Sequence, residues 1–212
     1  MSKTQNKQTA ASSRKIRNIC CYCGSSAGIS PQYDAAARQF GEILARQNIG
    51  LVYGGGDRGL MGAVANAARM NGGDVTGIIP DFLIDREGLA ADAQNQIIVP
   101  DMHTRKRLMF EQADAFVALP GGMGTLEELI EQLSWVQLGR HTKPVVIADI
   151  DGFWRPLLDV FHHMREHGFI RAEFEVQYLV AEKVEDIVPM IEASLARTQA
   201  RGAAQETLDT RL

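Results

Sequence analysis

The decapeptide LPGGMGTLEE, residues 119–128, combines residue types that can hold an anion with two carboxylates. It follows a short apolar run, and its glycines permit a tight turn that leaves backbone amides exposed. A helix beginning near Thr125 would point the positive end of its dipole at this turn, where the Thr125 hydroxyl could donate to a phosphate oxygen. The segment therefore predicts a phosphate cradle. Its expected members are Gly121, Gly122, Gly124 and Thr125.

The acidic end of this segment has two interpretations. Thr125 and Glu128 match the capping box T-x-x-E, in which Glu128 would accept a hydrogen bond from the amide at the helix N-cap. Capping accounts for one carboxylate, but not for the open turn before it. Alternatively, Glu127 and Glu128 face a bound ligand. The stretch MHTRK adds Arg105 and Lys106 upstream, where they could form a second anion clamp, although such a pair is commonly surface charge.

A rival motif lies at residues 54–59, where GGGDRG fits G-x-G-x-x-G between an apolar run and a helical pattern. In a dinucleotide fold this loop follows the first strand, and an acidic residue stands about 20 residues further on. Here the loop follows the second apolar run, and the acid would have to be Asp81. An NAD(P)-binding enzyme therefore stays as an alternative.

Two strings resemble metal sites. HMREH at 163–167 spells H-x-x-E-H, but at about 100° per residue both histidines fall on the side of the helix that faces water. Cys20 and Cys23 form C-x-x-C without further ligands at partner spacing, and the run Ile16–Cys23 is typical of a buried strand. We expect no metal site and no cofactor.

The elements that must position these residues alternate along the chain. Short β-rich runs are separated by helical patterns such as 31–47, with Ser30 as N-cap and Pro31 at the first helical position. This order predicts a Rossmann-like α/β fold with a doubly wound parallel sheet, in which ligands bind beyond the carboxyl ends of the strands. The expected strands are Ile16–Cys23, Ile49–Tyr53, Val75–Ile79, Ile97–Val99, Ala115–Leu119, Val145–Ala148 and Val176–Val180.

Length and composition set the broader limits. With 212 residues, 45% of them hydrophobic, the chain can bury one sizeable core, and we expect a single domain over 16–196 with mobile tails at 1–15 and 197–212. The 22 Lys and Arg against 26 Asp and Glu give no reason to expect nucleic acid or a membrane surface as partner. A small ligand is favoured. Without a signal-peptide pattern or 18 consecutive apolar residues, we expect a cytoplasmic protein.

Four motifs in order, CGSSAG, YGGGDRGLMG, MHTRK and PGGMGTLEE, resemble the LONELY GUY (LOG) family over about residues 16–190. Members of that family are phosphoribohydrolases that cleave cytokinin riboside 5′-monophosphates, some also AMP, and they have been called lysine decarboxylases. The resemblance implies a Rossmann-like fold, a homodimer with active sites near the subunit interface, and release of free base and ribose 5-phosphate. A non-catalytic nucleotide carrier stays as an alternative.

The resemblance also implies roles for individual residues. Arg105 and Glu128 become the catalytic pair, and the glycines and threonine of the cradle hold the 5′-phosphate. The remaining residues expected to contact substrate are Met102, Lys106 and Glu127. We expect segment 81–99 to border the base, but it matches the family loosely, so the preferred base is not implied.

Overall fold

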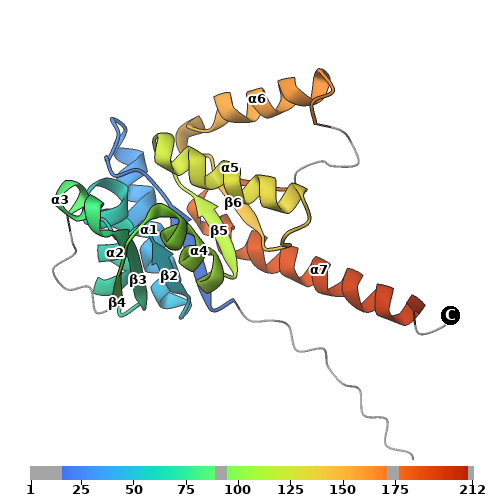
Figure 1. The fold of residues 1–212 in the computed structure, drawn as a ribbon, viewed down its shortest axis with the longest axis horizontal. Coiled ribbons are helices and arrows are strands. Elements are labelled where there is room, and N and C mark those ends of the chain that lie inside the picture. The colour runs from blue at the N-terminus through green and yellow to red at the C-terminus, as the bar shows by residue number, and fades with distance from the viewer. Residues whose placement is uncertain (1–15, 89–94, 171–176, 210–212) are drawn as a thin grey trace, which may run out of the picture.

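The computed structural model describes residues 16–88, 95–170 and 177–209, with side chains as far as residue 200. It is a single α/β domain in three layers, a parallel sheet between two layers of helices (Figure 1). The strands are β1 (Asn18–Tyr22), β2 (Gly50–Tyr53), β3 (Val75–Pro80), β4 (Asn95–Val99), β5 (Ala115–Ala118), β6 (Val145–Ala148) and β7 (Leu179–Ala181). The α-helices are α1 (Pro31–Arg46), α2 (Gly59–Met70), α3 (Ile84–Glu87), α4 (Met102–Gln112), α5 (Met123–Gln137), α6 (Arg155–Glu166) and α7 (Ile187–Asp209).

The predicted alternation of strands and helices is confirmed. Each expected apolar run holds one strand of the seven-stranded sheet, and the last begins later than expected, at Leu179. Helix α1 begins at Pro31 after Ser30, whose hydroxyl accepts from the Gln32 amide as an N-cap should. Helix α7 continues to Asp209, past the expected domain end at 196. The expected tail at 1–15 lies outside the described residues.

The strand order β4-β3-β2-β1-β5-β6-β7 sets the position of any ligand site. Strand β1 pairs with β2 on one side and with β5 on the other, all parallel, so the winding direction reverses between β1 and β5. In open parallel sheets, ligands bind beyond the carboxyl ends of the strands at such a switch point. The loops that leave β1 and β5 there begin with Cys23 and Leu119.

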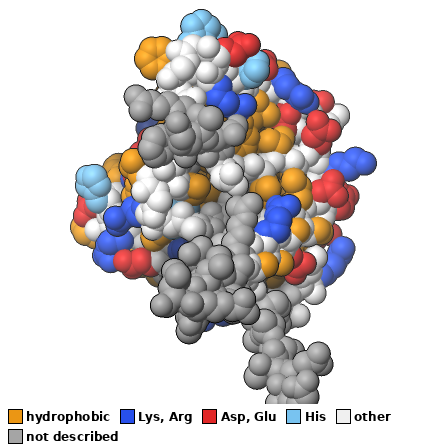
Figure 2. Space-filling model, turned by 90° about the vertical axis from the view of Figure 1, so that its right-hand side faces the viewer, with side chains coloured by type: hydrophobic (Ala, Val, Ile, Leu, Met, Phe, Trp, Pro, Cys, Tyr) orange, Lys and Arg blue, Asp and Glu red, His pale blue; other side chains and the backbone are white. Residues whose placement is uncertain are grey.

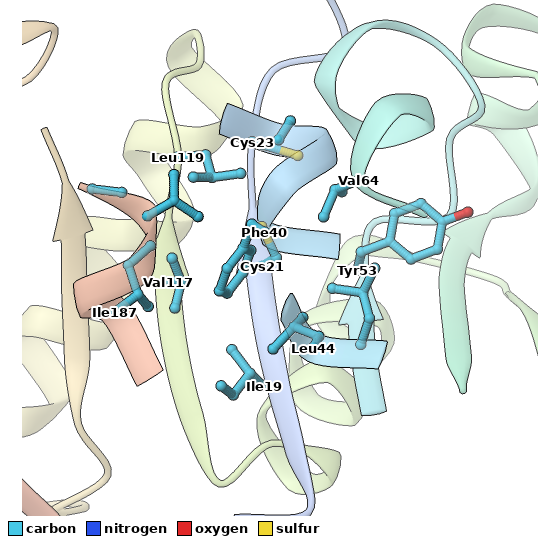
Figure 3. Packing of buried hydrophobic residues seen from close by; sticks show 14 of the residues in the cluster. Ile19, Cys21, Cys23, Phe40, Leu44, Tyr53, Val64, Val117, Leu119 and Ile187 are labelled. Carbon is cyan, nitrogen blue, oxygen red and sulfur yellow. The ribbon is translucent and has the colours of Figure 1, made fainter. Parts of the chain in front are cut away.

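Two apolar cores hold the layers together. Helices α1, α2 and α7 cover one face of the sheet, and Figure 3 shows side chains such as Phe40, Leu44 and Ile187 packed onto β1 and β5 there. Helices α4, α5 and α6 cover the other face, through side chains such as Met109 and Leu129. Burial of both strand faces explains the nearly continuous apolar runs.

The three cysteines belong to this packing. Cys20, Cys21 and Cys23 are all buried, with free thiols, as the expected strand requires. Burial raises the pKa of Cys20 far above the usual range for a thiol. No helix in the described part of the chain is long and apolar enough to cross a membrane.

Candidate active site

A cavity of about 380 Å³ opens at the switch point between β1 and β5. It lies beyond the carboxyl ends of β1 and β2, and the first turns of α4 and α5 and the short helix α3 complete its walls. Residues from six separated segments therefore meet there. Those that line it are Cys21, Tyr22, Cys23, Gly24, Ser25, Gly54, Met61, Leu83, Arg86, Glu87, Met102, Arg105, Gly122, Met123, Gly124, Thr125, Glu127 and Glu128.

The glycine turn before α5 is open toward the cavity. A side-chain carbon built on Gly122 or Gly124 would have no other atom within 4 Å, so both positions face free space. Gly121 differs, because such a carbon would collide with the Thr125 hydroxyl, and it lets the buried Thr125 close against the turn. The first amides of a helix have no acceptors within it, so the turn offers donors and the positive helix end to an anion.

Helix α5 begins two residues earlier than we expected. It starts at Met123, its N-cap is Gly122, and no side chain caps it. Thr125 is therefore inside the first turn, and the capping-box interpretation of Glu128 is wrong. The carboxylate of Glu128 is left for another role.

Glu128 and Arg105 meet in the wall of this cavity. Arg105 Nη1 lies 3.2 Å from Glu128 Oε1, and each side chain is only 9% exposed. The sequence separates these residues, and the contact forms because α4 and α5 pack side by side on the same face of the sheet. The contact is an ion pair without hydrogen-bond geometry, which leaves Glu128 Oε1 without a hydrogen-bond partner in the described structure. The pair has hydrogen-bonding capacity to spare for a ligand.

Backbone carbonyls of β3 and of the loop after β2 fix the guanidinium of Arg105. Its Nε donates to Ile78 O at 3.1 Å, and its Nη2 donates to Gly54 O at 3.3 Å. The guanidinium lies directly over Gly54, where a side-chain carbon would collide with Nη2. The glycine-rich loop after β2 therefore serves to seat Arg105.

Burial changes the acid–base behaviour of Glu128. Its pKa rises from 4.5 to about 7, because removal from water disfavours the carboxylate more than the Arg105 charge favours it. A carboxyl group in this range can give or take a proton near neutral pH. This group is therefore suited to acid–base chemistry as well as to charge stabilisation.

Lys106 does not extend into the cavity as a second anion clamp. Its Nζ lies 2.6 Å from Glu127 Oε1 and 2.9 Å from Glu131 Oε1, and it joins α4 to α5. Lys106 is absent from the described residues that line the cavity. Arg105 and Met102 do line it, with Met102 Sδ 3.9 Å from Arg105 Nη1. The two predicted cations thus have different surroundings.

The loop at 54–59, which matches the dinucleotide motif, leads into helix α2, whose first amides already have hydrogen-bond acceptors within the protein. The amides of Leu60 and Met61, at the start of α2, donate to Gly24 O at 3.0 and 3.3 Å. These are the groups that would bind the pyrophosphate of a dinucleotide. The occupied helix end argues against NAD(P) at this loop.

Comparison with known proteins agrees with the motifs. Residues 61–191 match a family profile described as "possible lysine decarboxylase". The chain is 43% identical over 178 residues to cytokinin riboside 5′-monophosphate phosphoribohydrolase LOG7 of Arabidopsis thaliana, covering 84% of this chain and 82% of the relative. It is 44% identical over 178 residues to cytokinin riboside 5′-monophosphate phosphoribohydrolase LOG3 of the same plant, covering 84% of this chain and 83% of the relative. The chain belongs to the LONELY GUY (LOG) family.

Solved structures with the same fold include proteins that bind or carry the molybdenum cofactor. The molybdenum cofactor carrier protein of Chlamydomonas reinhardtii superposes with a TM-score of 0.64 at 20% identity, covering 86% of this chain and 99% of that one. The molybdenum cofactor binding protein of Rippkaea orientalis gives 0.63 at 21% identity, covering 85% and 98%. At such low identity the likeness shows the fold alone.

The LOG family's older association with lysine decarboxylation finds little support in this cavity. Amino-acid decarboxylases usually hold pyridoxal phosphate as a Schiff base on a lysine. No lysine is among the described residues that line the cavity, and the nearby Lys106 is engaged by two carboxylates. The described residues that line the cavity therefore do not fit pyridoxal phosphate.

The HMREH string lies away from the site of this LOG protein. His163 and His167 are exposed on α6, as the helical pattern predicted. In the described part of the chain, no three or more His, Cys, Asp or Glu residues are placed to hold a metal ion.

The sequence led us to expect segment 81–99 near the base, but it singled out none of that segment's residues for the site. Leu83, at the end of the short turn Asp81–Leu83, and Arg86 and Glu87 of α3 line the cavity. Their segment has no glycine signature and no clear periodicity. The one available signal was position, because the segment follows β3 at the same edge of the sheet as the other loops.

Proposed function

We propose that this LOG protein hydrolyses the N-glycosidic bond of purine riboside 5′-monophosphates, either N6-substituted cytokinin nucleotides or AMP, to free base and ribose 5-phosphate. The observation that carries the proposal is the placement of the buried Glu128–Arg105 pair one turn along α5 from an open glycine cradle. The known activity by which its plant relatives are named supports the same reaction.

The substrate would bind by its 5′-phosphate first. The amides at the start of α5 and the Thr125 hydroxyl would donate to phosphate oxygens, in the free space in front of Gly122 and Gly124. The ribose is the next group of the nucleotide, so it would lie over the first turns of α5, near Glu128. The base would then extend toward Leu83 and Met102.

Glu128 would act on the ribose carbon that loses the base. Breaking the glycosidic bond gives an oxocarbenium-like transition state with positive charge on the sugar. A carboxylate about 5 Å away at an effective dielectric near 20 lowers its energy by about 3 kcal/mol, which corresponds to about two decades in rate. The same carboxylate could take a proton from the attacking water, because its pKa is about 7.

Arg105 would favour the charged form of Glu128. Its positive charge lowers the pKa of Glu128, against the larger effect of burial. Its anchors on the Ile78 and Gly54 carbonyls hold it in one place, and its remaining N–H groups can hold the ligand or assist departure of the base.

Product analysis tests the proposal. The wild type should release free base and ribose 5-phosphate from AMP or isopentenyladenosine monophosphate, followed by chromatography. Glu128→Gln keeps the side-chain shape and removes the charge, so kcat should fall about 100-fold or more by the Coulomb estimate above. Glu192→Gln is the matched control, since Glu192 is exposed on α7. Tight AMP binding with no product in the wild type would instead favour a carrier.

We also propose a homodimer, as the LOG resemblance implies. A mainly apolar groove of about 280 Å³ runs between α5 and α6, and Met164 and Phe169 beside it are 41% and 85% exposed. Hydrophobic side chains gather between charged ones on the face shown in Figure 2. Light scattering should give twice the chain mass, and Met164→Glu should halve it. A wild-type monomer would refute the dimer.

The cytoplasmic location expected from the sequence stays a prediction.

A further inference from the structure

Two histidines at the end of α6 take no part in the proposed reaction. His163 lies in the last turn of this helix, and His167 is its C-cap residue. Both side chains are exposed. The sequence led us to expect no metal site here, because both histidines were predicted to face water. The way the two rings are arranged in the structure leads to a different conclusion.

The rings of the two histidines lie next to each other. A spacing of four residues puts both side chains on one side of the helix, and the ring centroids are 4.0 Å apart with 43° between the ring planes. Two histidines at this spacing are how a helix presents two nitrogen ligands to one metal ion in the H-E-x-x-H motif. Zinc–nitrogen bonds are about 2.0–2.1 Å long, so two ligands of one ion must come this close.

A hydrogen bond orients the ring of His167 as a metal ligand would need. Its Nδ1 lies 2.9 Å from the backbone oxygen of His163. A carbonyl oxygen can only accept, so Nδ1 carries the proton, and Nε2 of the neutral ring keeps its lone pair. Histidines that bind metals commonly donate their other ring N–H to a backbone carbonyl in this way. Nε2 of His167 is therefore available as a ligand.

The charges around the pair also favour a cation. The C-terminal end of a helix carries partial negative charge, and His167 lies at that end of α6. Glu166 adds a carboxylate on the same turn, 3.2 Å from His162 Nε2. The basic side chain of this turn, Arg165, donates to Tyr178 Oη at 3.2 Å, and both residues line the groove between α5 and α6.

We propose that His163 and His167 together bind a divalent transition-metal ion, His167 through its Nε2, with water in the remaining positions. Imidazole suits zinc, copper and nickel, whereas Mg²⁺ prefers oxygen ligands. The described part of the chain offers no group of three such ligands, so the ion would keep several open positions. Neither histidine lines the cavity that holds Glu128 and Arg105. The metal site is therefore separate from the proposed active site.

Calorimetric titration of the untagged protein with NiCl₂ at pH 8 tests the site, because metal ligation requires neutral imidazoles. The wild type should bind one Ni²⁺ per chain and give no such binding with MgCl₂. His163→Asn and His167→Asn should each weaken Ni²⁺ binding about 100-fold, because two ligands held on one helix act as a bivalent site. His162→Asn removes an exposed histidine of the same helix and should keep the wild-type Kd.

Thermal unfolding gives a second readout. Excess Ni²⁺ should raise the melting temperature of the wild type and of His162→Asn, because the ion binds the folded pair. The melting temperatures of His163→Asn and His167→Asn should not respond to Ni²⁺. Without metal, all three variants should melt close to the wild type, since the three positions are exposed.

Three results would overturn the site. The first is a wild type that does not bind Ni²⁺. The second is binding that survives either His163→Asn or His167→Asn at the wild-type Kd, since a chelating pair needs both rings. The third is one ion per two chains, which would make the ion a link between copies. None of these results would touch the proposed hydrolysis, whose residues lie in the cavity.

Discussion

Replacement of the buried acid Glu128 by glutamine should make the unliganded protein more stable at alkaline pH. The pKa of Glu128 rises from 4.5 to about 7 on folding, so the folded protein holds this proton more tightly than the unfolded chain does. The group's contribution is therefore most favourable below pH 4.5 and is lost as the pH rises through 7. A shift of 2.5 units, from 4.5 to 7, corresponds to about 3 kcal/mol of unfolding free energy.

Glutamine resembles the protonated form of Glu128 in shape and charge. Glu128→Gln also loses the attraction between the carboxylate and Arg105. The free-energy difference of about 3 kcal/mol already counts this loss, because the protonated form of Glu128 lacks the same attraction. Glu128→Gln should thus exceed the wild type by up to about 3 kcal/mol at pH 8, and by little below pH 4.5. For a chain of this size, such a gain raises the melting temperature by about 6–12 °C.

Urea unfolding at pH 8 and at pH 4, followed by tryptophan fluorescence, measures both differences. Glu192→Gln is the control, since its exposed carboxylate should change stability little at either pH. If Glu128→Gln were less stable than the wild type at pH 8, the ion pair with Arg105 would outweigh burial. The raised pKa, and the acid–base role drawn from it, would then be refuted.

Three further predictions concern the surroundings of this pair. Gly54→Ala places a carbon where Arg105 lies, so it should lower kcat/KM for AMP about 10- to 100-fold, and unchanged kinetics would show that Arg105 can move without loss. Gly122→Ala adds a carbon that meets no protein atom, so the melting temperature should stay within about 2 °C while KM for AMP rises at least tenfold; an unchanged KM would remove this glycine from the phosphate site. Lys106→Met breaks the link from α4 to α5 and should lower kcat and stability with little effect on KM, whereas a raised KM alone would return Lys106 to the substrate.

Local sequence was enough for the fold and for part of this site. Strands buried on both faces read as apolar runs, and Ser30 and Pro31 mark the start of α1 as local chemistry dictates. The glycine turn before α5 was recognisable because its residue types are required by its geometry.

Other features depend on which segments the fold brings together. The ion pair of Lys106 with Glu127 and Glu131 could not be foreseen, because it arises from the packing of α4 on α5. The capping-box prediction failed for a related reason. Gly122 can begin a helix without a side-chain cap, so the presence of Thr125 and Glu128 at capping-box spacing did not decide where α5 starts.

Burial of the Glu128 carboxylate lowers the stability of the unliganded protein. The same burial would make the carboxylate more effective in its proposed role. In water the carboxylate would be a weak neighbour for a developing positive charge, because solvent screens it. In the cavity it is 9% exposed, and Arg105, its ion-pair partner, is fixed by backbone carbonyls of β3 and of the loop after β2. A cation forming on the sugar would give the carboxylate the favourable partner that Arg105 supplies only in part. Glu128→Gln should consequently gain stability and lose turnover, and finding both in one variant would connect the fold to the reaction.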